Sequence, residues 1–306
     1  MIEERAEYYL RTDPQASVVE AWTPWHLPFM HLSAEQKRYR ESLRGALRAL
    51  RPADAILATY ASSKVTRKLD TENILFYNVG ASPFRHLARK SLEFERSYSV
   101  PLPPVSLSFE AGHYVKYETR LGEVDVSGKV AVPILNSGAV KLAGPRELRK
   151  LVALWWSLKP TIERTVSEPW SPEDPFAVHL HISAPAKVPL NLADIVKPLM
   201  DGFISTLHLY EGQQLDEVAV RIASSLDVSV DDVRKKLPDD TNAVLGPKAV
   251  PHLYRKGLQW SPADHPLKAG KVCREETCDG APVQIKAFFC RLTVGLGVRE
   301  TRVTSI

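Results

Sequence analysis

The chain reads Asn191-Leu192-Ala193-Asp194-Ile195-Val196-Lys197, with Asp201 four residues further on. Apolar residues recur at spacings of three and four through this region, which predicts a helix from about Asp194 to His208. Asp194, Lys197 and Asp201 then share its opposite face. The sequence thus places two acids and one amine along a single polar stripe.

The segments on either side of this helix predict strands. Ala177 to Ile182 alternates apolar and polar residues, so His179 and His181 lie on the same face. Such a pair can offer two imidazoles to one metal ion, but it is also common on the wetter face of an ordinary strand. Leu215 to Ile222, which contains the acidic pair Asp216-Glu217, is also expected to form a strand.

A basic helix is predicted near the N-terminus. Ser33 is expected to cap a helix from about Ala34 to Leu50, whose apolar stripe is flanked by cations. The cations that can track a phosphate backbone are Lys37, Arg40, Arg44 and Arg48 on this helix and Lys64, Arg67 and Lys68 in a later turn. A solvated helix face is the alternative interpretation of such a run.

The remaining pattern predicts an α+β fold with a mixed sheet and packed helices. Strands are expected at residues 54–60, 74–79, 105–109, 114–118 and 129–134, a helix is expected to open at Pro145, and the tail after Pro238 is expected to be rich in loops. The stretch from Val100 to Pro104 marks a boundary, because proline cannot continue a helix or a central strand. The expected division is an N-terminal region (1–99), a central domain (100–228) and a C-terminal extension (229–306).

Composition indicates a soluble protein. The chain has 306 residues, 44% of them hydrophobic, and a formal net charge of +4, which permits a nucleic-acid partner without demonstrating one. No uncharged apolar run approaches the roughly 18 residues needed to span a bilayer, so no membrane role and a cytoplasmic location are expected. Cys273, Cys278 and Cys290 are an odd number, so reduced thiols are expected, with zinc binding alongside His265 as the alternative.

The proline-rich boundary, the strand with the two histidines and the polar-striped helix occur in the order seen in RusA-type Holliday-junction resolvases. This resemblance covers residues 100 to about 225. The family pattern is D-x-D-N-x-x-K-x-x-x-D, followed after a loop by D-D-x-x-V, and it is matched by Lys197, Asp201, Asp216 and Val220. The resemblance implies DNA as the partner, acids that bind Mg²⁺ or Mn²⁺ for phosphodiester hydrolysis, and a lysine that assists.

The sequence departs from this pattern at the acids themselves. Asn191 stands at the first acid, Ala193 at the second, and Asp194 where the family has asparagine. A magnesium nuclease needs several anionic oxygens, and alanine supplies none. The candidate metal ligands of this half are therefore Asp194, Asp201, Asp216 and Glu217, and the catalytic candidates are Lys197, Asp194 and Asp216.

The first half of the chain contains the motif that the second half lacks. Asp70-Thr71-Glu72-Asn73 has the form D-x-[DE]-N, and placing Asp70 on Asn191 aligns residues 54–60 with residues 175–181. This alignment suggests a decayed internal duplication, although Asp and Asn are also frequent turn residues. If the duplication is real, Asp70 and Glu72 from one half and Lys197 from the other build a composite metal site.

Three classes of function follow from these observations. The first is a RusA-like, magnesium-dependent endonuclease acting on branched or duplex DNA. The second is a catalytically inactive RusA-like protein that binds nucleic acid or assembles a complex, as a homodimer or a larger assembly, because a fold alone does not guarantee an activity. The third is an unrelated enzyme or small-molecule binder that uses His179, His181 and Asp194. The endonuclease is expected to cleave DNA when a divalent metal is present. The inactive protein is expected to bind nucleic acid without cleaving it, and the third class is expected to do neither.

Overall fold

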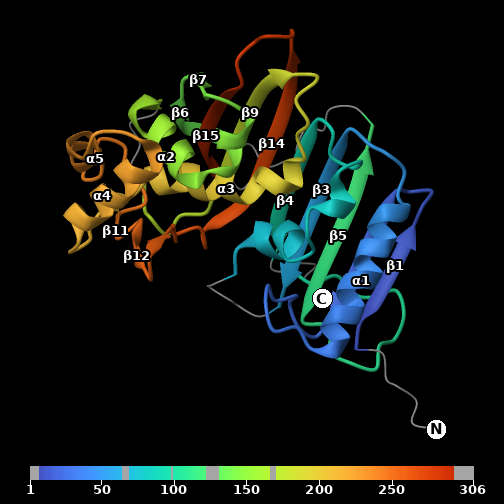
Figure 1. Cartoon of the computed structure of the whole chain (residues 1–306). Coiled ribbons are helices and arrows are strands. Elements are labelled where there is room, and N and C mark those ends of the chain that lie inside the picture. Colours follow the sequence, from blue (N-terminus) through green and yellow to red (C-terminus); the bar gives the residue numbers. More distant parts are fainter. Residues whose placement is uncertain (1–6, 64–68, 98, 122–130, 166–169, 293–306) are drawn as a thin grey trace, which may run out of the picture.

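The computed structural model describes residues 7–63, 69–97, 99–121, 131–165 and 170–292 and has an α+β fold (Figure 1). One large mixed sheet has the strand order β1-β2-β5-β3-β4-β14-β9-β15-β6-β8, with β7 paired to β15. Its strands are β1 (Tyr9–Asp13), β2 (Val18–Thr23), β3 (Ala55–Ser62), β4 (Ser91–Ser97), β5 (His113–Arg120), β6 (Ala131–Ser137), β7 (Val140–Lys141), β8 (Ile162–Arg164), β9 (Phe176–Pro185), β14 (Leu267–Thr277) and β15 (Gln284–Leu292). Two small sheets pair β10 (Leu209–Tyr210) with β11 (Pro247–Lys248) and β12 (His252–Tyr254) with β13 (Gly257–Gln259).

The helices vary in type as well as in length. The α-helices are α1 (Ala34–Ala49), α2 (Leu151–Leu158), α3 (Leu192–Thr206), α4 (Leu215–Leu226) and α5 (Val230–Lys236). A π-helix, η1 (Asn73–Tyr77), follows β3, and short 3₁₀ helices are η2 (Ser82–Phe84), η3 (Pro145–Arg149) and η4 (Lys159–Thr161). In Figure 1, α4 and α5 lie at the end of the molecule far from α1, where with α2 they enclose a separate hydrophobic cluster.

The large sheet has the same pairing pattern on both sides of its centre. β4 and β14 lie antiparallel in the middle. On one side β4 is parallel to β3, which is antiparallel to β5; on the other side β14 is parallel to β9, which is antiparallel to β15. The antiparallel pairs β5–β2 and β15–β6 extend the pattern outward. The expected domain limits at residues 99 and 228 therefore cut through one continuous sheet.

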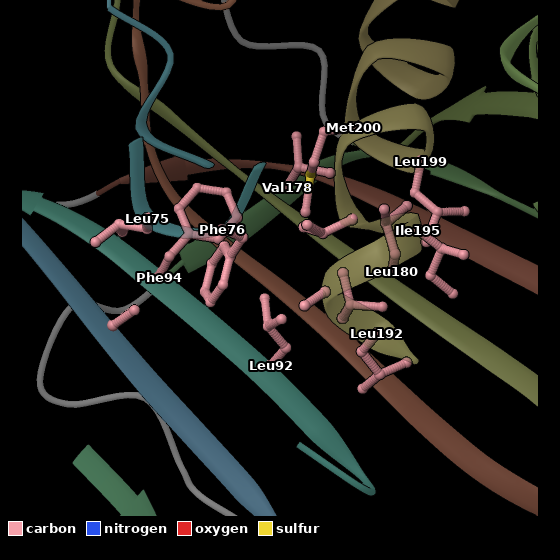
Figure 2. Close-up of a cluster of buried hydrophobic side chains, with 14 of the residues drawn as sticks. Leu75, Phe76, Leu92, Phe94, Val178, Leu180, Leu192, Ile195, Leu199 and Met200 are labelled. Carbon is pink, nitrogen blue, oxygen red and sulfur yellow. The ribbon is translucent and has the colours of Figure 1, made fainter. Parts of the chain in front are cut away.

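A hydrophobic core beneath the helices joins the two sides of the sheet. Figure 2 shows side chains from η1, β4, β9 and α3 in contact across the middle strands: Leu75, Phe76, Leu92, Phe94, Val178, Leu180, Leu192, Ile195, Leu199 and Met200. All of these side chains are buried. Burial of one such side chain stabilises the fold by about 1.5–3 kcal/mol. This shared core holds η1 and α3 over the same part of the sheet.

Gly270 on β14 allows this core to pack closely. A Cβ atom at this position would lie 2.2 Å from Phe94 and 3.0 Å from Met200. Phe94 is the residue paired with Gly270 on β4, and Met200 reaches down from α3. The absence of a side chain at Gly270 therefore gives the Phe94 ring and α3 room above the centre of the sheet.

Several elements agree with the sequence. Ser33 caps α1 through a full capping box, because its hydroxyl accepts from Gln36 N–H while the Gln36 side chain accepts from Ser33 N–H. The strand with the two histidines is β9, and the helix with the polar stripe is α3, which begins two residues earlier than predicted. The expectation of a mixed α+β fold is thus confirmed.

Four other expectations are wrong. Residues 74–79 were predicted as a strand, but residues 74–77 belong to η1, where Ile74, Leu75 and Phe76 are buried. Residues 215–222, also predicted as a strand, belong to α4, in which Val218 and Ile222 lie four apart on the buried face. Short apolar runs do not distinguish a buried helix from a strand. Residues 105–109 form no strand, whereas the tail expected to be loop-rich supplies β14 at the centre of the sheet.

Among the described residues, no helix combines the length and the apolar character that crossing a bilayer requires.

Candidate functional site

Two acids approach the centre of the molecule from the segment that follows β3. Asp70 accepts a hydrogen bond from the Asn73 side chain at 2.6 Å, and its backbone carbonyl accepts from Ile74 N–H. Glu72 directly precedes η1, and its side chain is only 1% exposed. A π-helical turn is rare and occurs frequently at functional sites. Here it continues from the residues that carry the two carboxylates.

Helix α3 brings a lysine to these acids. Asn191 caps the helix by accepting from Ala193 N–H, and Lys197 lies one to two turns further along. Lys197 Nζ lies 2.9 Å from an oxygen of Asp201, 3.6 Å from Glu72 and 3.8 Å from Asp70. Residues from the two halves of the chain therefore form one ionic cluster, as the composite-site hypothesis requires.

Asp264 is the fourth acid of this cluster, and the sequence analysis missed it. Its carboxylate lies with those of Asp70 and Glu72 so that one oxygen from each falls within 4.8 Å of the others. Asp264 precedes β14, which the sequence analysis did not predict. The local signal was weak, because the residues that follow this acid, Leu267 to Val272, include two lysines and a glycine.

His208 supports the loop that carries Asp264. Its Nε2 accepts a hydrogen bond from Ala263 N–H at 3.0 Å, and its Nδ1 donates to the Gly246 carbonyl at 3.1 Å. Burial lowers the pKa of His208 to about 4. The imidazole is therefore neutral near pH 7, with the proton on Nδ1, and fixes the residue immediately before Asp264.

The cluster contains four carboxylates, Asp70, Glu72, Asp201 and Asp264, and one ammonium group. Burial raises the pKa of Glu72 to about 7, with Asp201 and Asp70 adding to the effect and Lys197 opposing it. Burial and the neighbouring carboxylates also hold the pKa of Asp264 well above its ordinary value. Burial lowers the pKa of Lys197, but Asp201 and Glu72 outweigh it, so this pKa is raised. The site thus holds more buried carboxyl groups than one lysine can neutralise, and their raised pKa values reflect this surplus.

A divalent cation fits this environment. Neither carboxylate oxygen of Glu72 has a hydrogen-bond partner among the described residues, although both are buried. Oxygens on opposite sides of one octahedral Mg²⁺ lie about 4.2 Å apart, so a spread of up to 4.8 Å closes with small side-chain movements. Three carboxylates of this kind are hard ligands, which favours Mg²⁺ or Mn²⁺ over softer metals.

The structure does not bring the other predicted ligands to this site. Asp194 forms an ion pair with Arg149 at 2.7 Å on the surface. Asp216 and Glu217 lie in the first turn of α4, where they pair with Arg234 and Arg221 and remain 79% and 53% exposed. The expectation that Asp194, Asp216 and Glu217 converge with Asp201 on one metal ion is therefore corrected, because residues 215–222 belong to α4, a helix of the separate hydrophobic cluster, and form no strand.

The predicted phosphate-binding cations are distributed differently. Lys37 and Arg48 are exposed on α1. Arg44 donates to the Val79 carbonyl at 2.5 Å and pairs with Glu41, which Arg40 also approaches at 3.8 Å. Arg44 therefore holds the segment that directly follows η1. Lys64, Arg67 and Lys68 lie outside the described residues.

The histidines and cysteines form no metal site in the described part of the chain. Burial and Lys271 lower the pKa of His179 to about 4, and burial also lowers that of His181. His265 contacts Glu173 at 3.3 Å. Cys278 is exposed and Cys290 is buried, and neither they nor Cys273 form a disulfide. Within the described residues, the group of Asp70, Glu72 and Asp264 has the geometry of a metal site.

No protein-family model, curated protein or solved structure matches this chain. The chemistry of the site must therefore be inferred from its own residues.

Proposed function

We propose that this protein is a RusA-like endonuclease that uses Mg²⁺ or Mn²⁺ to hydrolyse phosphodiester bonds in branched or duplex DNA. Its site is composite: Asp70 and Glu72 come from the first half of the chain, and Lys197, Asp201 and Asp264 come from the second. The observation that carries the proposal is the approach of three carboxylates to a single point beside a lysine, where the buried Glu72 carboxylate has no hydrogen-bond partner among the residues that the structure describes.

The residues divide into ligands and a positioning pair. Asp70, Glu72 and Asp264 would hold the cation, which when bound stabilises the charge that develops on a phosphate under attack. Lys197 supplies a donor and a positive charge beside them, within reach of a phosphate oxygen. The buried carboxylate of Asp201 lies 2.9 Å from the Lys197 ammonium group and holds it in place.

The topology of the second half supports the RusA-like interpretation. β9 leads into α3, which carries Lys197 and Asp201, and the chain returns through Asp264 into β14, parallel to β9. In this proposal Asp264 takes the place that the sequence pattern gave to Asp216, an acid at the entrance to a strand. The segment between α3 and Asp264, with α4 and α5, is then an insertion that packs beside α2.

The symmetry of the sheet supports an internal duplication. In each half the chain passes from an inner strand (β3 or β9) over the helical face to a central strand (β4 or β14) and then to an outer strand (β5 or β15). The pairing directions are the same in both halves. A duplicated unit whose two copies lost different residues explains why neither half holds a complete motif.

The inactive nucleic-acid-binding or assembly protein is the competing function, because Asn191 and Ala193 replace two acids of the pattern. Asp70 and Glu72 compensate for this loss, since they reach the same lysine from the other half. The structure thus offers a source of ligands that the second half lacks.

Cleavage assays with labelled four-way junctions and duplexes test the proposal. We expect cleavage with Mg²⁺ or Mn²⁺ and none with EDTA. Glu72→Gln and Asp264→Asn should each abolish cleavage, whereas Asp216→Ala, a matched change of a surface acid, should retain it. Full activity in Asp264→Asn, or loss in Asp216→Ala, would place the chemistry elsewhere. DNA binding without cleavage under every metal would favour the inactive protein.

A further inference from the structure

The composite site has a counterpart related to it by the symmetry of the sheet. Asp70 and Asn191 are 121 residues apart, as are Ala55 and Phe176, the first residues of β3 and β9. One alignment therefore relates both the motifs and the strands before them. The same offset places Phe76 on Lys197 and Gly80 on Asp201.

The counterpart is also assembled from both halves. Asn191 Nδ2 donates at 3.0 Å to the carbonyl of Ala81, the neighbour of Gly80. Across the centre of the sheet, Asp70 lies 3.8 Å from Lys197. The motif of each half thus lies against the helical segment of the other half. In the composite site these residues are charged, and in the counterpart they are not.

Every charged residue of the composite site is replaced in the counterpart. Asn191 and Ala193 stand for Asp70 and Glu72, and Phe76 and Gly80 stand for Lys197 and Asp201. Ala88 comes three residues before β4, as Asp264 comes three residues before β14. These five side chains supply no carboxylate for a divalent cation, which needs several anionic oxygens. The group of metal-ligand type found among the described residues is that of the composite site.

We propose that each chain cuts one phosphodiester bond per encounter with DNA, so that its product is a nick rather than a pair of opposed cuts. This inference rests on the proposed function. In each cut, a water oxygen bonds to phosphorus, the bond from phosphorus to one sugar oxygen breaks, and the proton released by the water ends on that oxygen. One phosphate monoester and one hydroxyl remain at the nick.

A supercoiled plasmid with an inverted repeat that extrudes a four-way junction tests this proposal. One cut converts the plasmid to an open circle, whereas two opposed cuts across the junction make it linear. The full-length protein is bound first, and Mg²⁺ is then added together with excess competitor junction, so that each complex acts once. We expect open circles.

Two paired chains could each make one cut and so produce linear plasmid. To distinguish this case from two cuts by one chain, the protein is co-expressed with a large excess of Asp264→Asn chains. If each chain cuts once, any linear product made by paired chains is replaced by open circles in the mixed sample. Linear product that persists there shows that one chain makes both cuts and overturns the proposal, while leaving the hydrolase function intact. No cleavage with any metal rejects the proposed function and this inference with it.

Discussion

Glu72 has an unusual environment, because its carboxylate is buried among other acids and has no hydrogen-bond partner in the described part of the chain. The sequence identified Asp70, Glu72 and Lys197 as partners because their motif matched the positions altered in the second half. It could not identify Asp264, since that acid lies 63 positions after Asp201 and only the sheet returns it to the site. Asp194 and Asp216 fit the spacing of the sequence motif, but the fold places both acids in surface ion pairs away from Lys197.

The raised pKa of Glu72 predicts a pH dependence of stability. Its pKa rises from 4.5 to about 7 in the folded protein, so between these values the folded state holds a proton that the unfolded state has released. Stability therefore falls as pH rises from about 5 to 8, by an amount on the order of 3 kcal/mol. Urea unfolding in EDTA across this range measures it. Mg²⁺ should restore the loss at high pH, because it binds only the folded state.

Glu72→Gln is the control for this prediction, since an amide of the same shape does not titrate. The difference in free energy of unfolding between the variant and the wild type should grow as pH rises. Parallel pH curves for the two proteins would show that Glu72 does not titrate in this range.

At the scale of the elements, regular segments with strong local signals were predictable and short apolar segments were not. Ser33 and Gln36 specify the start of α1, and the alternation of residues 177–182 specifies β9. Residues 74–79 form a short, mostly apolar run, so their periodicity does not distinguish η1 from a strand, and tertiary burial decides the outcome.

The packing of α3 on the sheet predicts the cost of a side chain at Gly270. Gly270→Ala should destabilise the protein by roughly 1–3 kcal/mol, because the added methyl group overlaps Phe94 and Met200 in a closely packed core. Gly45→Ala is the matched change in α1, where nothing lies within 4 Å of the added atom. It should stabilise by roughly 0.5–1 kcal/mol. Thermal unfolding compares the two, and equal effects would contradict this packing.

The α1 cations also predict two separable effects. If Lys37 and Arg48 contact DNA phosphates, changing both to Ala should reduce the slope of log affinity against log salt by about 1.8. Arg44→Ala should instead lower stability, because Arg44 holds the Val79 carbonyl and Glu41. Fluorescence-detected DNA binding at several salt concentrations measures the slope. An unchanged slope in the double variant would show that Lys37 and Arg48 do not contact DNA phosphates and that this face of α1 is only solvated.

At the scale of the whole molecule, the continuous sheet explains how two incomplete motifs form one site. The antiparallel pairing of β4 with β14 places the helical segment after β3 beside the helix after β9. Sequence alignment suggested the repeat from a few residues, but the order of the strands depends on long-range pairing that no local pattern encodes. The same pairing brings Asp264, far along the chain, to the acids of the first half.

Anomalous diffraction from crystals soaked in Mn²⁺ tests the composite metal site most directly. A composite site predicts one strong peak per chain, with carboxylate oxygens of Asp70, Glu72 and Asp264 about 2.0–2.6 Å from the ion. The peak should disappear in the Asp70→Asn, Glu72→Gln variant. Mn²⁺ bound instead by Asp194, Asp216 or Glu217, or no peak at the three carboxylates, would contradict the composite site.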